Sequence, residues 1–328
     1  MMTSKLANAS LFIFLAAASV SFAQTGPRLL LEPLPKGQNY QLNTEAAWFE
    51  RSDLDNTSND LGMMTYEASG RARFELGAIT QTIQRAQPRI GFDLFAMDLF
   101  NDDALLPGQF TDVSVGASFG ILSQDKWVAG IALGVGFASA NAFQDANGLY
   151  IKADLAVGYT IDERQTFGLV LTYDGNRSIF PDIPLPGFQY TNRYSDELTF
   201  SIGFPFTGLT YKPDDKWTFE VTFAIPDNFA GKIDYGFTKE FGAFVQLTNK
   251  NVAFKWNELE DSTDRVIFSQ SRAELGLRGT INEKASFVIA GGYAFNQEFE
   301  AGFDSRDADT IAKLDPSLFG RLGFELRF

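Results

Sequence analysis

The chain has 328 residues, no cysteine and no histidine, and a formal net charge of −14 at pH 7. Without cysteine it has neither a disulfide framework nor the residue that anchors a lipoprotein, and an acidic chain has no electrostatic basis for binding nucleic acid. Without histidine or cysteine, the Ser-His, Cys-His and Asp-His catalytic arrangements cannot be assembled. No acidic pair stands out for glycosidase chemistry. The composition therefore predicts a protein that is not an enzyme and needs no cofactor.

Residues 1–23 have the pattern of a secretory signal peptide. Lys5 supplies a positive charge, Leu11 to Val20 form an apolar run, and Ser21-Phe22-Ala23 form a small-x-small cleavage site. The apolar run is too short to cross a bilayer as a helix, for which about 20 residues are needed. We therefore expect the mature chain to begin at Gln24 and to lie beyond the inner membrane.

Most of the remaining sequence alternates between apolar and polar residues. Val113 to Ile121 and Trp127 to Phe137 each place apolar residues at every second position, as expected of β-strands. Short charged turns alternate with longer polar loops along the chain. An aromatic residue follows each short turn, at Trp127, Phe167, Trp217, Phe241 and Phe287. Short turns at one end, longer loops at the other and aromatic side chains at the strand ends are typical of bacterial transmembrane β-barrels.

Strand length and strand number define the expected barrel. Many runs reach nine residues or more, the length that crosses a bilayer at a tilt, whereas strands of soluble sheets are about five or six residues long. Counting back from the C-terminus to Arg89 gives 12 strands, and the runs 40–51 and 65–83 raise the number to 14. The sequence predicts an all-β fold, a single transmembrane antiparallel up-and-down β-barrel of about 14 strands (alternative 12) over residues 40–328. Residues 24–39 are expected to form an irregular periplasmic leader.

The C-terminal strand supports this architecture. From Leu318 the apolar and polar faces alternate up to the terminal Phe328. This ending resembles the C-terminal assembly signature of Gram-negative outer-membrane β-barrel proteins, and the turn Lys212 to Trp217 resembles one found in an uncharacterised family of such barrels. The resemblance implies location in the bacterial outer membrane, contact with outer-membrane lipid, and recognition of Phe324, Leu326 and Phe328 by the barrel-assembly machinery. It implies no substrate.

Charged residues on the strand faces opposite the apolar faces are expected to point into the lumen. By this criterion the candidates are Arg71, Arg73, Glu75, Asp93, Lys152, Asp154, Arg272, Glu274, Arg278, Arg321, Glu325 and Arg327. They could form a region that selects ions, since rings of charge determine which ions pass. They could equally form a paired network that fills the interior of a modest barrel. The sequence does not decide between these two interpretations.

One long loop stands out, from Asp174 to Asp196. Its prolines make it stiff, and it carries the apolar side chains Phe180, Ile183, Leu185 and Phe188. These four residues could constrict the mouth of the barrel or bind a hydrophobic ligand. The alternative is a stiff loop that packs on its own barrel.

The expected outer loops are acidic. Asp304, Asp307 and Asp309 are spaced like the ligands of a calcium loop, but the central glycine is missing and Arg306 would compete with an ion. We consider weak binding of a divalent cation at these loops, and the alternative of a solvated acidic rim.

The expected barrel size leaves two functions open. A barrel of 12 to 14 strands lies between 8-stranded barrels filled by side chains and 16-stranded porins with open channels. We therefore predict a passive channel or transporter for small or hydrophobic solutes, and keep as the alternative a closed structural or surface-interaction barrel without transport activity. The oligomeric state is not predicted.

Overall fold

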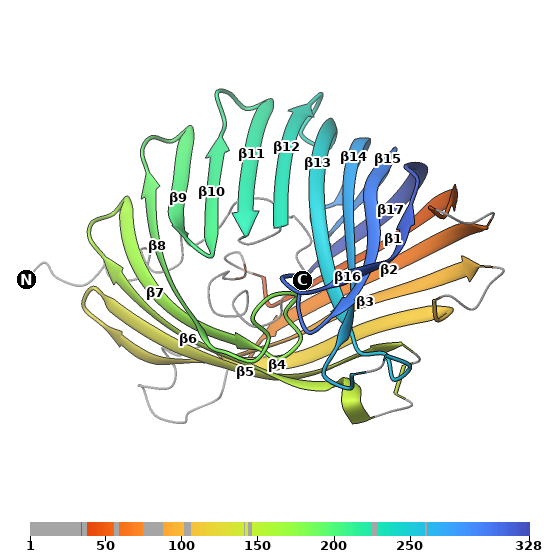
Figure 1. Cartoon of the computed structure of the whole chain (residues 1–328). Coiled ribbons are helices and arrows are strands. Elements are labelled where there is room, and N and C mark those ends of the chain that lie inside the picture. The colour runs from red at the N-terminus through yellow and green to blue at the C-terminus, as the bar shows by residue number, and fades with distance from the viewer. Residues whose placement is uncertain are drawn as a thin grey trace, which may run out of the picture.

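The fold is a closed antiparallel β-barrel. The computed structural model describes residues 34, 38–55, 59–74, 88–101, 106–140, 142–143, 146–224, 228–259 and 261–328. Within these residues the strands form one sheet, in which strands that follow one another in the chain pair, except that the next-to-last strand does not pair with the last (Figure 1). The first strand pairs with the last, from Gln41 opposite Arg327 to Phe49 opposite Phe319, and so closes the barrel. In the described part of the chain, no helix is long and apolar enough to span a membrane.

Sixteen of the seventeen described strands form the barrel wall, and β16 pairs only with β15. The strands are β1 (Tyr40–Asp53), β2 (Asp60–Arg73), β3 (Arg89–Asn101), β4 (Gln109–Gln124), β5 (Trp127–Ala140), β6 (Leu149–Thr160), β7 (Gln165–Asp174), β8 (Leu185–Arg193), β9 (Leu198–Phe204), β10 (Phe206–Tyr211), β11 (Trp217–Ala224), β12 (Asn228–Gly236), β13 (Phe241–Phe254), β14 (Arg265–Asn282), β15 (Ala285–Gly302), β16 (Asp309–Leu314) and β17 (Ser317–Arg327), with one short 3-10 helix, η1 (Ala146–Gly148), before β6.

The two ends of the barrel differ in their connections. At the turn end most connections are short, although residues 74–88 separate β2 from β3 there, and Tyr40 lies beside Phe328, whose amide donates to the Tyr40 carbonyl at 3.0 Å. The short turns of this end are 125–126, 161–164, 194–197, 212–216, 237–240 and 283–284. The opposite end, called the loop end, carries the longer connections 175–184 and 303–308. This asymmetry confirms the arrangement of turns and loops that the sequence predicts.

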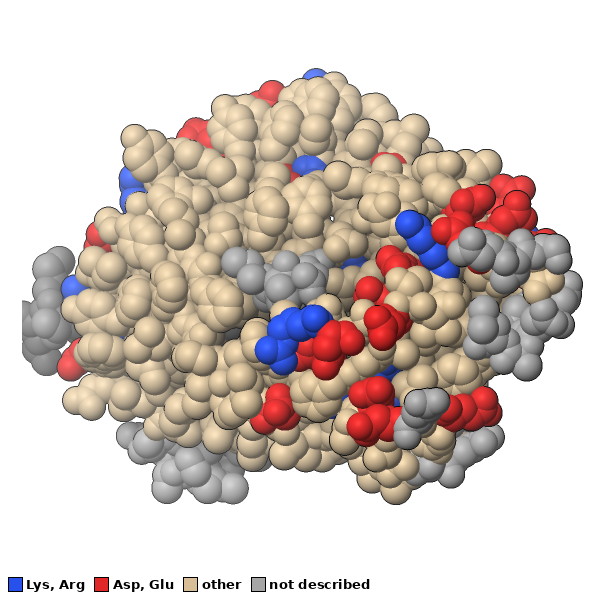
Figure 2. Space-filling view, viewed as in Figure 1, with Lys and Arg blue, Asp and Glu red and all other residues tan. Residues whose placement is uncertain are grey.

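The outer face of the wall is apolar. Leu275, Ile289 and Leu322 are more than half exposed because their side chains point away from the lumen. Aromatic rings gather at the turn end, where Trp127 packs on Tyr159 and Trp217 packs on Tyr235, each pair with centroids 4.7 Å apart. Charged side chains lie mainly toward the loops and strand ends, and the rest of the visible face is largely uncharged (Figure 2). An apolar band bordered by aromatic rings is the surface that a lipid bilayer requires.

The wall has sixteen strands where the sequence analysis predicts fourteen. Strand β8 lies within the predicted loop 174–196, where prolines argue against a strand. Pro186 is tolerated because it pairs with Leu171 on one side only, and pairing with β9 begins later, at Phe188. Residues Leu198 to Phe206 alternate as a single strand would, but they belong to a hairpin, because the chain reverses at Pro205 while the apolar alternation continues.

The height of the wall varies around the barrel. Strands β14 and β15 have 18 residues each, whereas β9, β10 and β11 have 7, 6 and 8 residues. The short strands lie side by side in one arc of the wall (Figure 1). They fall below the length of about 9 to 11 residues with which a tilted strand crosses a bilayer. We call β9, β10 and β11 the low wall.

An apolar core occupies the barrel toward the loop end, between the long strands. It includes Phe49, Leu61, Met63, Phe95, Met97, Phe110, Phe254, Val266, Phe268 and Phe299. Phe110 packs against Phe254 with centroids 4.9 Å apart, and Phe268 against Phe299 at 4.7 Å. These side chains come from β1 to β4 and β13 to β15, so they join opposite sides of the barrel. We call this cluster the loop-end core.

Strands β5 and β13 meet beside the loop-end core. The two strands are not neighbours in the sheet, yet Ser139 and Lys255 form a parallel bridge. The Ala140 amide donates to the Lys255 carbonyl at 2.8 Å, and the Lys255 amide donates to Ala138 at 3.1 Å. This contact draws opposite parts of the wall together at the loop end and encloses the core between them.

Candidate functional site in the lumen

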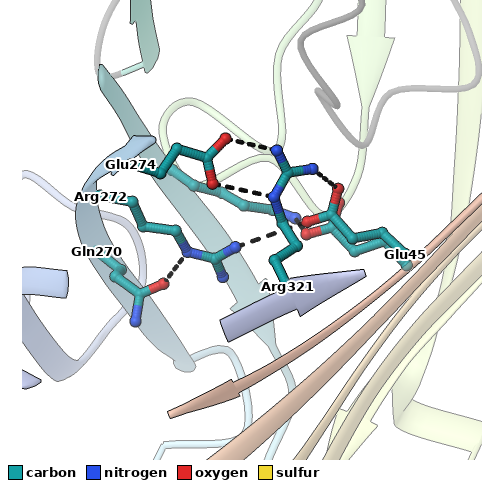
Figure 3. Close-up of polar contacts among 7 residues, drawn as sticks. Glu45, Gln270, Arg272, Glu274 and Arg321 are labelled. Carbon is teal, nitrogen blue, oxygen red and sulfur yellow. Dashed lines mark hydrogen bonds and ion pairs between the residues drawn. The ribbon is translucent and has the colours of Figure 1, made fainter. Parts of the chain in front are cut away.

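Four alternating charges lie next to the loop-end core, on its turn-end side. Arg321 of β17 donates through Nε to Glu274 of β14 at 2.9 Å and through Nη1 to Glu45 of β1 at 2.5 Å. Arg272 Nη1 lies 3.8 Å from Glu45 Oε1. The side chains converge from three strands, as Figure 3 shows. We call these four residues the charge quartet.

Small residues on β15 allow the charge quartet to assemble. This strand separates β14 from β17, and its inward positions at this level are Ala290, Gly292 and Ala294. Ala290 pairs with Arg321, and Gly292 pairs with Glu274. Because no large side chain stands between them, the long guanidinium of Arg321 reaches across β15 to the carboxylate of Glu274.

The charge quartet is tied to the core by stacking and by amide hydrogen bonds. The guanidinium of Arg272 lies 4.8 Å from the ring centroid of Phe49, a cation–π geometry. Its Nε donates to Gln270 Oε1 at 2.5 Å, and Gln270 donates to Gln297 at 2.7 Å. Both glutamines are almost fully buried. Arg272 therefore has a fixed position rather than that of a side chain free in a water-filled pore.

A further ion pair crosses the lumen. Lys250 of β13 donates to Glu67 Oε1 of β2 at 2.6 Å, and its Nζ lies 4.1 Å from the Phe95 ring centroid. Strands β2 and β13 are separated in the sheet by β14, β15, β17 and β1. The pair therefore bridges two parts of the wall that are not neighbours, next to Phe95 of the loop-end core.

A second polar cluster lies on β4, β6 and β7. Lys152 Nζ is 3.3 Å from Asp174 Oδ2, and Tyr150 donates to Asp112 at 2.6 Å. Asp154 is 2% exposed, and neither of its carboxylate oxygens accepts a hydrogen bond. Its register partner on β7 is Thr172.

Other paired charges lie near the turn end. Arg278 donates through Nε to both oxygens of Asp234, at 2.9 and 2.7 Å. Arg327 donates to Glu325 at 2.8 Å, and Arg71 donates to Gln41 at 2.9 Å. The mouth at this end is thus lined by side chains that already bind one another.

The predicted lumen residues face inward wherever the structure describes them. Those residues are Arg71, Arg73, Asp93, Lys152, Asp154, Arg272, Glu274, Arg278, Arg321, Glu325 and Arg327, while Glu75 lies outside the described residues. They are distributed among separate clusters instead of forming one ring. The mutual pairing supports the interpretation as interior filling, and a role in ion selectivity remains a prediction.

Sequence reasoning missed several residues that complete these clusters. Glu45 and Glu67 lie in the two N-terminal runs whose alternation is weak, and Lys250 follows the last apolar position of its predicted strand. The alternation of strand faces would have identified all three as inward-facing residues. Their partners could not have been found, because which strands face each other across a lumen depends on how the barrel closes.

The predicted loop candidates separate in the structure. Phe180 lies under Arg306, with 4.0 Å between the guanidinium carbon and the ring centroid. Ile183 is exposed on the loop, and Leu185 lies on the inner face of β8 opposite the buried Thr172. Phe188 lies on the outer face, paired with the exposed Leu169, and therefore does not line the lumen.

The loop 175–184 packs on the loop that follows β15. The buried carboxylate of Asp304 accepts the Phe180 amide at 3.1 Å and binds the Arg306 guanidinium through both oxygens. Ser305 also donates to the Ser178 carbonyl at 2.8 Å. Burial opposes ionisation of Asp304, but these donors outweigh it and lower its pKa.

Metal and assembly partners remain predictions. Among the described residues, no three acidic side chains are grouped to hold a metal ion, and the oxygens of Asp304 already bind Arg306. The described residues therefore provide no set of ligands for a divalent cation at the outer loops. Phe324 and Phe328 are about half exposed on the outer face at the turn end, with Leu326 on the same face. That placement leaves them accessible, and their recognition by assembly machinery is a prediction.

The closed antiparallel wall, its apolar outer face and its charged interior define a transmembrane β-barrel of the bacterial outer-membrane class. Residues 187–327 match a family described as a domain of unknown function (DUF6268). No curated protein matches the chain.

Several solved structures with a similar fold are outer-membrane channels. The CymD monoaromatic hydrocarbon channel has 11% identity and a TM-score of 0.46, with 97% of this chain and 99% of that chain covered. A FadL homologue from Pseudomonas aeruginosa has 10% identity and a TM-score of 0.44, with 93% of each chain covered. The toluene transporter TodX from Pseudomonas putida has 8% identity and a TM-score of 0.37, with 90% of each covered. Because these values are low, the function has to be inferred from this chain's own residues.

Proposed function

We propose that the chain is an outer-membrane transport barrel that conducts small solutes along a route that avoids the barrel axis. The observation that carries this proposal is the loop-end core. Phe110, Phe254 and Phe299 are fully buried in it, and the β5–β13 contact encloses it. A straight pore along the axis would have to pass through packed aromatic rings. A close-packed interior of this kind leaves no space for a solute.

The low wall is the place where such a route can pass beside the loop-end core, because none of the core residues comes from β9, β10 or β11. Strands β9 to β11 end nearer the middle of the bilayer than β14 and β15 do, because they have fewer than half as many residues. Neither β9 nor β10 contains a charged residue. A solute entering from the turn end would therefore pass along the inner face of the low wall, away from the charge quartet.

The absence of cysteine allows this route to be tested with single thiols. Ser201 faces inward on β9, and Tyr194 lies exposed in the neighbouring turn. Ser201→Cys replaces a single oxygen atom by sulfur, and heat-modifiable gel mobility checks that the variant is folded. In proteoliposome swelling assays, we expect the unmodified variant to conduct small solutes and a bulky methanethiosulfonate reagent to slow the flux at least several-fold. The same reagent on Tyr194→Cys should leave the flux unchanged. Failure of the reagent to reach Cys at 201, or modification there without effect, would contradict the route.

The loop-end core also favours a second candidate function. A barrel closed by packed aromatic side chains and paired interior charges suits a structural or surface-interaction protein that transports nothing. The swelling assay distinguishes the two functions. A reconstituted wild-type protein that shows heat-modifiable gel mobility, and is therefore folded, but passes no solute of any size would support the closed barrel.

A further inference from the structure

We infer that the inner face of β7 to β11 is a binding site for small, uncharged solutes rich in hydroxyl or amide groups. This inference rests on the proposed function and specifies its substrate class. The site is a row of short polar side chains. One register row runs from Thr166 on β7 through Thr191 and Ser201 to Gly208 and Thr222 on β11. Gln189 and Thr210 flank the row. We call these residues the hydroxyl row.

Several polar groups of the hydroxyl row have no partner within the protein. The hydroxyls of Thr166, Thr210 and Thr222 and the amide nitrogen of Gln189 are buried without a hydrogen bond, and all four residues are at most 8% exposed. In the middle of the row, Thr191 and Ser201 bind each other at 2.8 Å. A buried donor or acceptor without a partner is costly, by about 1–3 kcal/mol each. Four such groups on one inner wall indicate that something outside this chain's own residues completes them.

The chemistry of the row selects against anionic solutes. Its side chains carry no formal charge, and neither do the other residues of β9 and β10. A carboxylate group placed there would lose its hydration without gaining a cationic partner from the row. Two inward charges lie beside the row. Arg193 is two residues from Thr191 and already pairs with Asp196 at 2.9 Å. Glu220 is the register partner of Thr210 and would repel an anion.

The row also selects against hydrocarbons. An apolar solute would cover the hydroxyls of Thr166 and Thr222 without offering them a donor or acceptor. The free-energy cost of burying these hydroxyls without a hydrogen bond would therefore remain. A polyol presents several groups that both donate and accept, and threonine hydroxyls also do both. Glycines at 203 and 208 lie on the same inner face between the polar side chains. They have no side chain that would occupy the space in which such a solute would lie.

The test compares one neutral polyol with one charged solute in reconstituted protein. Proteoliposomes containing the full chain are exposed to isosmotic sorbitol or to sodium glutamate, and the half-saturating concentration for flux is measured. Thr210→Val together with Thr222→Val removes two unpaired hydroxyls on the adjacent strands β10 and β11, within reach of one solute, while retaining the side-chain shape. The matched control is Thr44→Val, an exposed threonine on the outer face of β1.

We expect sorbitol to pass faster than glutamate, and the double variant to raise the half-saturating sorbitol concentration on the order of tenfold, as the loss of two hydrogen bonds predicts. Thr44→Val should have no effect. Faster glutamate than sorbitol would overturn the inference while leaving the transport function intact. An unchanged half-saturating concentration in the folded double variant would also overturn it. Flux of neither solute through folded protein would overturn both the inference and the proposed function.

Discussion

Arg321 Nε lies 2.9 Å from Glu274 Oε2, and the same guanidinium also holds Glu45 at 2.5 Å. One positive charge from β17 thereby joins two carboxylates from β14 and β1, next to the point where the barrel closes. The side chains of Arg321 and Glu274 are 12% and 5% exposed, so water compensates little for a missing partner. The pairing therefore accounts for why these charges can lie in a barrel interior without forming a hydrated pore.

The first prediction concerns this pairing. Arg321→Gln should lower the free energy of unfolding in urea by about 3–5 kcal/mol, because it leaves two carboxylates buried beside each other. Adding Glu274→Gln should restore part of the loss, since the remaining carboxylate, Glu45, still lies beside Arg272. Arg327→Gln on the same strand is the control, since the Arg327 side chain is 44% exposed and exposed ion pairs contribute about 0–1 kcal/mol. Equal effects of Arg321→Gln and Arg327→Gln would contradict the assignment.

The second prediction contrasts two aspartates of the β6–β7 cluster. Asp174→Asn removes the partner of Lys152, whose side chain is 6% exposed, and should destabilise the fold by about 3–5 kcal/mol. Asp154→Asn should leave stability unchanged or raise it, because no hydrogen bond stabilises the Asp154 carboxylate and neutralising a buried, unpaired charge removes a cost. Urea unfolding in lipid vesicles measures both variants. The reverse order of stability would show that Asp154 is the structural charge.

The third prediction concerns the contact between the loops 175–184 and 303–308. Because Arg306 and two backbone amides lower the pKa of Asp304, its contribution is complete above the usual aspartate pKa of about 4. It is lost as the pH falls through the lowered pKa of the folded state. Hydrogen exchange of the Phe180 amide should therefore accelerate only in acid, below that usual pKa. Asp304→Asn should produce fast exchange already at pH 7.

The control for the loop contact is Asp309→Asn. Asp309 is exposed at the start of β16, so its loss should leave exchange at Phe180 as slow as in the wild type. Slow exchange in Asp304→Asn at pH 7 would mean that backbone contacts such as that of Ser305 with Ser178 hold the loops without the carboxylate.

Local alternation carries most of the information about this fold. Which charged side chains face inward could be predicted, because side-chain direction in a strand depends only on parity. Their partners could not, since Lys250 and Glu67 are 183 residues apart in the sequence. The pair forms only once the barrel closes and brings β13 opposite β2. The strands β8 and β10 were missed because Pro186 argues against a strand and the apolar alternation runs on through Pro205.

The loop-end core left a weaker signal in the sequence. In β3 the outward Phe92 and Leu94 are apolar, and so are the inward Phe95 and Met97. The alternation of polar and apolar faces is therefore lost toward the loop end of that strand. A strand with two apolar faces indicates that its inner side packs against protein instead of water. Such a strand in the sequence of a barrel therefore favours a closed end over an open pore.

Planar-bilayer recording tests most directly whether the loop-end core closes the axis. The wild type should show no large ohmic conductance, whereas Phe110→Ala with Phe254→Ala, which removes two fully buried rings that pack at 4.9 Å, should open steps of clearly larger conductance in the molecules that remain folded. Leu275→Ala on the lipid-facing side of β14 is the matched control and should behave like the wild type. A large wild-type conductance that the double truncation does not change would contradict the closed axis.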